Sequence, residues 1–411
     1  MPAFSSIIET ILTNEKQHMP QVHVDTESAA RIRVIGIGGS GKNAINHMVA
    51  SRVKGVDFVV VNTDAQDLQQ SGARTKIHIG KNLTRGLGAG MNPALGKRAT
   101  EETQAEIQDA LRGSDMVFIT CGMGGGTGTG SAPVVAKLAK ESGALTVAVV
   151  TKPFSFEGQQ RMRLAEQGLE ELRKEVDALI VIPNDRLLAV VDQNTTVKSA
   201  FAMCDEVLRQ AVEGVSDLIT TPGNINLDFA DIKAIMEDAG SALMGVGIAA
   251  GEKRAQEAAR SAINSPLLDI SITGAKGVLL SIAGGEDLGL LEVQAAAQIV
   301  TESIDKNAKV IFGTSKDERL KKGEVRVTVI ATGFPEEGSA GRGQPLFQLG
   351  VKKDKPKEEE TVAGKIYNTV MPAREEEVPF AAEEKKTSPK PADDDDDWGA
   401  VPAFLRRSKK S

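Results

Sequence analysis

The strongest constraint on the fold of this chain is a set of three glycine-rich segments, each of which opens a helical pattern. Gly36–Asn43 (GIGGSGKN) follows an apolar stretch at Arg31–Ile37, and Cys121–Gly130 (CGMGGGTGTG) follows another at Asp115–Thr120. Leu87–Pro93 (LGAGMNP) is the third. Glycine lets the backbone approach a ligand closely, and a helix N-terminus carries partial positive charge. We therefore expect one crevice that binds several phosphates, at the carboxyl ends of parallel strands.

Strand and helix patterns alternate over the first 334 residues, which predicts an α/β fold with a parallel sheet and right-handed crossovers. Strands are expected at Arg31–Ile37, Asp57–Val61, Thr75–Ile79, Asp115–Thr120, Ala144–Val150 and Ala178–Ile182. Helices are expected between them, at Pro93–Arg112, Ser131–Ser142 and Gly158–Glu175.

A longer helix is expected next, because apolar residues recur at steps of three and four from Val197 to Ile219. Thr221-Pro222-Gly223 ends it, and a smaller α/β domain follows. Its helices are expected at Ala230–Asp238, Arg254–Ile263 and Leu291–Asp305, and its strands at Leu243–Ala249, Gly277–Ile282, Val310–Gly313 and Val325–Ala331.

The composition changes after Phe334. Residues 335–411 hold 30 charged side chains and eight of the 16 prolines, so this segment is expected to be disordered. An apolar cluster with a basic flank lies near its end: Trp398, Val401, Pro402, Ala403, Phe404, Leu405, Arg406 and Arg407. A frayed tail is one interpretation. We favour a short motif that folds on a partner, because the only Trp of the chain lies in an otherwise apolar-poor tail.

The overall composition excludes several classes of protein. Lys and Arg number 49 against 56 Asp and Glu, so no basic excess is present to coat nucleic acid. Two cysteines cannot build a disulfide framework, which favours the reducing cytoplasm. No apolar run reaches the roughly 18 residues of a membrane span, and we expect no direct membrane insertion. The four histidines are scattered, so we expect no metal site built by the chain alone.

Gly36–Asn43 fits two phosphate-binding patterns without deciding between them. Its glycines match the dinucleotide fingerprint, and Asp64 after the second strand keeps a ribose contact open. They also match the start of a P-loop, although Asn43 replaces the hydroxyl residue that would hold Mg²⁺. Lys42 either adds charge near phosphate or points to solvent. Cys121–Gly130 argues more strongly for a ligand, because a helix end alone needs only one glycine.

Within that second segment, Gly124–Gly130 reads GGGTGTG, which is the glycine signature of the tubulin-like GTPases. Over residues 31–334 the chain resembles the FtsZ family of bacterial cell-division GTPases, and its end is similar to that family's partner-binding peptide. The residues that carry the resemblance are Gly36–Asn43, Asn62–Asp64, Gly124–Gly130, Thr151–Gly158, Asn226–Asp231 and Val401–Arg407.

The resemblance implies a Rossmann-like GTP-binding domain (31–196), a central helix (197–221) and a smaller C-terminal domain (222–334). An N-terminal extension (1–30), a disordered linker (335–395) and a partner-binding peptide (396–411) complete the expected organisation. The family polymerises head to tail into protofilaments, and GTP with its Mg²⁺ is hydrolysed to GDP between successive subunits. The filaments form the division ring at midcell, where the tail binds membrane tethers and other division proteins.

The resemblance also implies roles for individual residues. Contacts to phosphate and nucleoside are implied for Gly39, Ser40, Gly41, Lys42 and Asn43, for Gly90, and for Gly126, Thr127, Gly128 and Thr129. Glu157 and Arg161 resemble the ribose contact and its neighbour. Without the resemblance, their spacing favours an ion pair between successive turns on a solvated face. Phe201 would stack on guanine, with core packing as its alternative. Asp205 would accept from the base, and Glu206 stays an alternative acid.

For catalysis, the resemblance implies that Asp228 and Asp231 enter the next subunit's site and polarise the attacking water, with Asn226 assisting. Two rivals stay open at this point. One is an NAD-dependent dehydrogenase built on Gly36–Gly41. The other is a scaffold that binds nucleotide without hydrolysing it, which the presence of both carboxylates disfavours.

Overall fold

The computed structural model describes residues 30–188, 195–221, 225, 227–265, 272–317 and 319–334. The expectations for the N-terminal extension, the linker, the partner-binding peptide Val401–Arg407 and Asn226 lie outside these described residues.

The N-terminal half is built on a parallel sheet with the order β3-β2-β1-β4-β5-β6. Each of the six predicted strands is confirmed, with ends that differ by a residue or two. The strands are β1 (Ile32–Ile37), β2 (Val56–Asn62), β3 (Thr75–His78), β4 (Met116–Gly122), β5 (Leu145–Lys152) and β6 (Ala178–Pro183).

The helices of this half differ from the sequence prediction in several places, and three short helices, at Ala65–Gln69, Lys81–Thr84 and Asn184–Leu187, were not expected. The single helix expected at Pro93–Arg112 is two, because the Thr103 hydroxyl accepts from Gly80 N at 3.3 Å and Thr103 leaves helical geometry. The helix expected from Ser131 begins at Thr127, so glycines form its first turn. The helices are α2 (Gly38–Ala50), α3 (Ala65–Gln69), α4 (Lys81–Thr84), α5 (Pro93–Glu102), α6 (Gln104–Leu111), α7 (Thr127–Glu141), α8 (Gln159–Arg173) and α9 (Asn184–Leu187).

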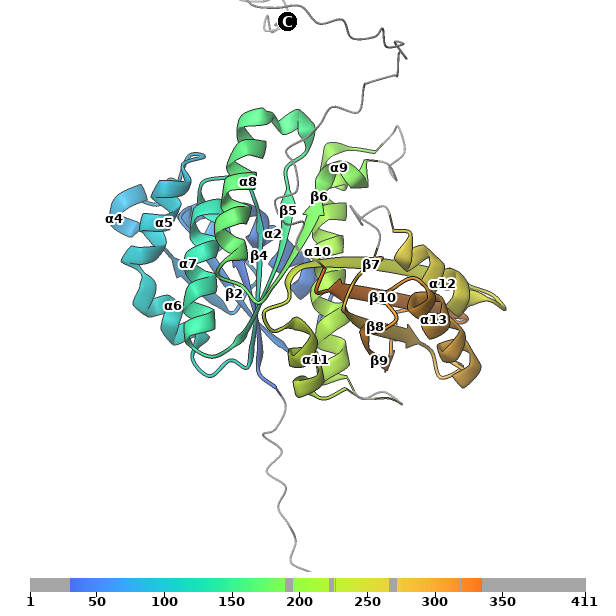
Figure 1. The fold of residues 1–411 in the computed structure, drawn as a ribbon. Helices are drawn as coiled ribbons and strands as arrows, with labels where there is room; N and C mark the ends of the chain where they lie inside the picture. The colour runs from blue at the N-terminus through green and yellow to red at the C-terminus, as the bar shows by residue number, and fades with distance from the viewer. Residues whose placement is uncertain are drawn as a thin grey trace, which may run out of the picture. The chain divides into compact units, whose positions relative to one another are not determined.

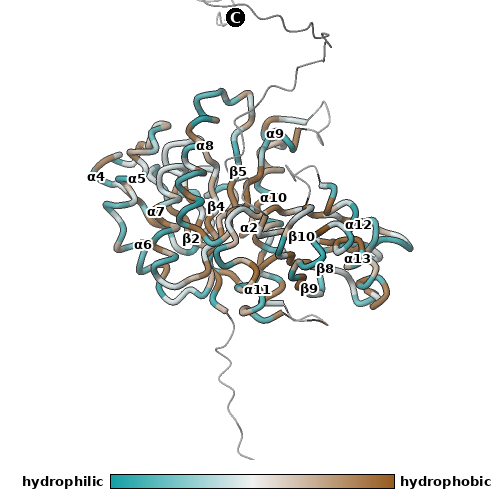
Figure 2. The backbone as a smooth tube through the Cα atoms, in the orientation of Figure 1, coloured by the Kyte–Doolittle hydropathy of each residue, from teal (hydrophilic) through white to brown (hydrophobic). Residues whose placement is uncertain are grey.

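The parallel sheet lies between two helical layers because its strands are apolar on both faces. Alternate strand residues such as Val34 and Phe118 pack under α2 and the long helix α10 (Val197–Thr220). Their neighbours Ile35 and Ile119 pack under α7 and α8. Figure 2 shows this apolar concentration in the central strands. The sheet is therefore buried, and its accessible part is the edge where the strands end.

The C-terminal half contains every element that the sequence predicts there. They are α11 (Phe229–Met236), β7 (Gly240–Ala250), α12 (Arg254–Ile263), β8 (Gly277–Gly284), α13 (Leu290–Glu302), β9 (Lys309–Lys316) and β10 (Glu324–Thr332). The strand order is β7-β10-β8-β9, and α10 runs between this sheet and the parallel one (Figure 1).

The two sheets are continuous, which the sequence did not indicate. The first residues of β7, Gly240 to Ala242, pair in parallel with β6, and the rest of β7 pairs antiparallel with β10. The two halves are therefore joined by backbone hydrogen bonds as well as by α10.

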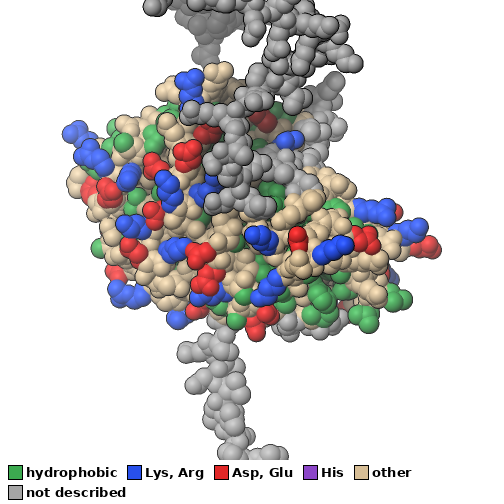
Figure 3. Space-filling view, viewed as in Figure 1, with side chains coloured by type: hydrophobic (Ala, Val, Ile, Leu, Met, Phe, Trp, Pro, Cys, Tyr) green, Lys and Arg blue, Asp and Glu red, His purple; other side chains and the backbone are tan. Residues whose placement is uncertain are grey.

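The described surface in Figure 3 intersperses Lys and Arg with Asp and Glu side chains. None of the helices in the described ranges has the length and apolar character that crossing a bilayer requires.

The contact between α5 and α7 depends on a glycine. A Cβ added at Gly130 would lie 2.0 Å from the carbonyl oxygen of Pro93, so we expect Gly130→Ala to lower the free energy of unfolding by about 2 kcal/mol. At Gly125 an added Cβ meets nothing within 4 Å, so Gly125→Ala is the matched control. Chemical unfolding measures both, and equal midpoints for the two variants would contradict this view of the helix contact.

Candidate functional site

A cavity of about 350 Å³ opens at the carboxyl ends of the central parallel strands. Such an edge is the usual binding place in open α/β sheets. The lining residues come from both halves of the parallel sheet and from the first turns of α10: Ile37, Gly38, Gly39, Ser40, Asn43, Gly122, Met123, Gly125, Gly126, Thr127, Gly128, Thr151, Pro153, Glu157, Arg161, Asn184, Phe201, Cys204 and Asp205.

Two glycine-rich segments meet at the floor of this cavity. A Cβ added at Gly38 would lie 3.3 Å from Gly128 N, and one at Gly122 would lie 2.8 Å from Ser40 Oγ. The Thr127 hydroxyl is 2.7 Å from the Thr63 hydroxyl, which holds the start of α7 beside the end of β2. Side chains at these glycines would push the segments apart, so the glycines allow two helix N-termini to share one cavity.

The N-termini of α2 and α7 both open onto the cavity, and neither is capped by a side chain. Neither helix has an acidic residue in its first turn. The first backbone N–H groups of a helix have no partner within it, and they carry the positive end of the helix dipole. Two such ends around one cavity favour a ligand with more than one negative charge.

Four residues of the predicted site lie beside the cavity rather than in its lining. Lys42 pairs with Asp67, Nζ to Oδ1 at 2.5 Å, and its side chain is only 8% exposed, so the solvent-pointing alternative is wrong. Gly41 is needed for packing, because an added Cβ would lie 2.6 Å from Thr120 O. The Thr129 hydroxyl accepts from Gly124 N, and Gly90 lies in the neighbouring segment before α5.

An aromatic side chain stands at the other end of the cavity. Phe201 is 40% exposed, so it is not a core residue, and its ring meets Phe154 edge to face at 5.4 Å between centroids. Phe154 in turn stacks on Phe156. Phe201 thus lines the cavity, and its ring is packed against Phe154. This arrangement suits stacking against a planar group.

Asp205 and Glu206 differ sharply in their surroundings. Asp205 lines the cavity, and burial raises its pKa to about 6, although His47 and Lys42 oppose the shift. Burial also acts on Glu206, but hydrogen bonds from Arg209 and His47 outweigh it and lower that pKa to about 2. Of these two acids, therefore, only Asp205 lines the cavity.

For Glu157 and Arg161 the ion pair expected from their spacing is confirmed, and the ribose contact stays a prediction. They form an ion pair between successive turns, and both line the cavity. Glu157 also accepts a hydrogen bond from Phe154 N at 2.9 Å, which fixes its carboxylate.

Asn184 is a lining residue that the sequence reasoning missed. It is buried at the end of β6, and its Oδ1 atom has no hydrogen-bond partner in the structure. An unpaired buried amide oxygen is costly, so this atom favours a ligand with an N–H or O–H donor. Its position directly after a parallel strand was the available sequence signal.

The predicted catalytic carboxylates lie away from the cavity. Asp228 caps α11 by accepting from Asp231 N at 2.8 Å, and neither residue lines the cavity. They follow the far end of α10, whose first turns carry Phe201 and Asp205. The helix alone separates the two places by about 20 Å, at 1.5 Å per residue.

Other features bear on the rival ligands. Asp64, which kept the dinucleotide-binding alternative open, caps α3 by accepting a hydrogen bond from Asp67 N and does not line the cavity.

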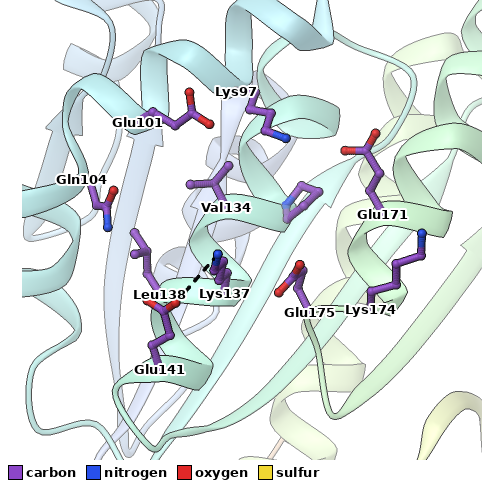
Figure 4. A pocket seen from close by; sticks show the side chains of 11 residues that line it. Lys97, Glu101, Gln104, Val134, Lys137, Leu138, Glu141, Glu171, Lys174 and Glu175 are labelled. Atoms are coloured by element: carbon purple, nitrogen blue, oxygen red, sulfur yellow. Dashed lines mark ion pairs between the residues drawn. The ribbon is translucent and has the colours of Figure 1, made fainter.

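A second cavity of about 400 Å³ between α5, α7 and α8 is lined by charges of both signs, including Lys97, Glu171 and the pair Lys137–Glu141 (Figure 4). None of its lining residues lies at the carboxyl end of a strand.

Comparison with known proteins agrees with this architecture. The family model for the Tubulin/FtsZ family, GTPase domain, matches residues 31–192, and that for the FtsZ family, C-terminal domain, matches residues 240–335. A solved empty FtsZ dimer from M. jannaschii is 47% identical over 81% of this chain and 92% of that chain, with a TM-score of 0.72. A GTPγS-bound CetZ2 protofilament from Haloferax volcanii shares the fold at 23% identity, covering 73% and 92%, with a TM-score of 0.63.

The dehydrogenase alternative is therefore wrong. Both halves match in order, and a solved relative is nearly half identical over most of the chain, so this chain belongs to the tubulin/FtsZ family of GTPases.

Proposed function

We propose that the cavity at the strand ends binds GTP, with the phosphates at the N-termini of α2 and α7. The observation that carries this proposal is the pair of uncapped helix ends brought together by Gly38 and Gly128. Backbone N–H groups from both helices would surround the phosphates, and the Ser40 and Thr127 hydroxyls would donate to them.

Mg²⁺ is proposed to bind with the nucleotide. Within the described residues no group of three or more His, Cys, Asp or Glu side chains is placed to hold a metal ion. Phosphate oxygens and water are ordinary Mg²⁺ ligands, so the donor set fits an ion carried by the triphosphate, where it would neutralise charge.

The guanine base is proposed to lie at the Phe201 end of the cavity. The carboxylate of Asp205 would accept from both guanine N–H positions, and the ring of Phe201 would stack on the base. The unpaired Oδ1 of Asn184 would gain a donor. Guanine carries adjacent N1–H and N2–H₂ donors, whereas adenine does not, so this arrangement favours GTP over ATP.

Hydrolysis is proposed to require a second copy of the chain. Asp228 and Asp231 lie beyond the far end of α10 and cannot reach the cavity of their own subunit. Head-to-tail assembly would bring them over the γ-phosphate of the next subunit, where they would orient and polarise the attacking water. The dimer form of the M. jannaschii relative supports self-association.

In the cell, we propose that these filaments form the cytoplasmic division ring at midcell. Residues 335–395 would act as a spacer, and Val401–Arg407 would bind membrane tethers and other division proteins. The support is the similarity of that peptide to the family's tail motif, together with its basic flank.

Nucleotide affinity should depend on pH through Asp205. Because the ionised carboxylate accepts the guanine N–H groups and its pKa in the free protein is about 6, the GDP dissociation constant should rise about tenfold per pH unit below 6. Titration calorimetry from pH 5 to pH 8 measures this dependence.

Asp205→Asn is the matched control, because its amide does not ionise. Its weaker GDP affinity should be nearly constant over the same range, and it should gain relative affinity for xanthosine nucleotides, whose O2 replaces the amino group. A wild-type affinity that stays constant from pH 5 to pH 8 would show that Asp205 does not bind the base.

The split site can be tested by mixing two inactive variants. Asp231→Ala should bind GTP without hydrolysing it, and Asp205→Lys should retain the catalytic acids without binding GTP. In a mixture, the GTP of one variant meets the intact Asp231 of the other, so turnover should reappear. Asp231 suits this test better than Asp228, whose side chain also caps α11.

Glu237→Ala is the control for the loss of an acid at the same helix. Glu237 is the C-cap residue of α11, and its ion pair in the described part of the chain is with exposed Lys233 at 3.5 Å, so the variant should keep wild-type turnover. If GTP turnover in the mixture were only the average of the turnovers of the two separate variants, a site shared between subunits would be ruled out.

GTP hydrolysis should not depend on the C-terminal peptide, residues 396–411. A chain lacking residues 396–411 should hydrolyse GTP at the wild-type rate, yet a fluorescent fusion of it should not concentrate at midcell. Removal of 16 linker residues, 365–380, is the matched control and should leave the midcell band in place. Loss of GTP turnover in the tail deletion would contradict this division of roles.

A further inference from the structure

A buried ion-pair cluster joins α10 to the C-terminal sheet, with Glu213 at its centre. Glu213 lies in the second half of α10, and its side chain is 3% exposed. It pairs with Arg209 one turn earlier, with Arg319 between β9 and β10 at 2.5 Å, and with Arg326 of β10 at 3.6 Å. The carboxylate of Glu213 on α10 therefore pairs with two arginines of the C-terminal half.

Asp317 and Asp217 complete the cluster. Asp317 Oδ2 lies 2.9 Å from Arg326 Nη2 and its Oδ1 lies 2.9 Å from Arg319 Nε. Asp217, one turn after Glu213, lies 3.8 Å from Arg326. Three arginines thus face three carboxylates where α10 meets β10. The pairs of Glu213 with Arg319 and Arg326, and that of Asp217 with Arg326, join α10 to the C-terminal half and depend on their relative position.

The backbone at this contact is also unusually close. Gly214 follows Glu213, and a Cβ added there would lie 3.0 Å from the Thr328 side chain of β10. The glycine lets α10 approach the strand, and the adjacent ion pairs then fix its position along the strand. A buried charge that loses its partner is strongly unfavourable, so such a cluster tolerates little displacement.

The cluster continues toward the cavity. Arg209 also bonds Glu206 through two nitrogens, at 2.7 and 2.5 Å, and Glu206 bonds His47 of α2 at 2.8 Å. α2 is one of the two helices whose N-terminus opens onto the cavity. The ion pairs therefore run from a helix of the proposed GTP site, through α10, to the C-terminal sheet.

The C-terminal sheet in turn holds the segment that leads to the catalytic acids. Thr314 of β9 donates its backbone N–H to Ile225 O at 3.1 Å, and its hydroxyl accepts from Ile225 N at 3.0 Å. Ile225 precedes Asp228 by three residues. The location of Asp228 and Asp231 relative to the cavity therefore depends on how this sheet is attached to α10.

We propose that Glu213 is a positioning residue for GTP hydrolysis: its ion pairs with Arg319 and Arg326 set the C-terminal sheet on α10. This fixes the separation between a subunit's GTP cavity and the acids that it offers to the next subunit. The proposal rests on the proposed split-site hydrolysis. Glu213 does not line the proposed GTP cavity, so its role is to position other groups and not to contact the nucleotide or the attacking water.

The first test measures position directly, in unassembled protein below the assembly threshold. Spin labels at Glu141→Cys on α7 and Thr301→Cys on α13 report the distance between the two halves, since both sites are exposed and the native Cys121 and Cys204 are buried. Pulsed electron resonance should give a narrow distance distribution for the wild type and a shifted or broader one for Glu213→Gln. An unchanged distribution would overturn the proposal.

The second test separates positioning from stability. GTP turnover per assembled subunit should fall at least about tenfold in Glu213→Gln, while the GTP dissociation constant of unassembled protein stays within about twofold. Glu213→Asp keeps the charge and should recover part of the turnover. Glu106→Gln, which removes an acid from the exposed pair with Lys81 at 3.5 Å, should match the wild type. A purely structural Glu213 would lower the unfolding midpoint and leave turnover per assembled subunit unchanged.

Arg319→Gln provides a milder variant if Glu213→Gln does not fold, because the Arg319 side chain is 45% exposed. It should shift the same distance distribution and lower the same turnover, and wild-type values for both would overturn the proposal. The distance test also distinguishes the failure of the positioning role from the failure of the split-site hypothesis. Wild-type turnover per subunit that does not rise with protein concentration would refute the split site, whereas an unchanged distance in the variants would refute the positioning role alone.

Discussion

The structure depends above all on the close approach of two glycine segments at the ends of β1 and β4. A Cβ added at Gly38 would lie only 3.3 Å from Gly128 N, and the N-termini of α2 and α7 open onto one cavity. Two helix ends without caps are electrostatically unfavourable side by side unless an anion lies between them. The glycines that allow the two segments to pack closely thus also produce a site that favours a polyphosphate ligand.

A second constraint follows from the length and position of α10. Its first turns carry Phe201 and Asp205 at the cavity, and its last turn leads to Asp228 and Asp231 at α11. One helix therefore spans the distance between the proposed binding groups and the proposed catalytic groups. In the function proposed above, a single subunit of this tubulin/FtsZ-family GTPase presents its nucleotide at one end and its catalytic carboxylates at the other. Hydrolysis would then require assembly, and we propose that the ion pairs of Glu213 set the separation.

Most of the fold could be predicted from sequence, because its strands are buried runs between glycines and α10 has a strict helical period. The predictions failed where a single side chain or backbone bond decides the structure. Thr103 divides one expected helix, and Gly240 continues the sheet across the two halves. In the site, the partner of Lys42 and the unpaired amide of Asn184 depend on contacts between distant segments, which periodicity and motif spacing do not encode.

The most direct test of the central claim is the rate of GTP hydrolysis per subunit as a function of protein concentration. If the cavity and the carboxylates belong to one site only across two subunits, the specific rate should be near zero at low concentration and rise steeply above an assembly threshold. A specific rate that is the same at all concentrations would place catalysis within one subunit and contradict the account.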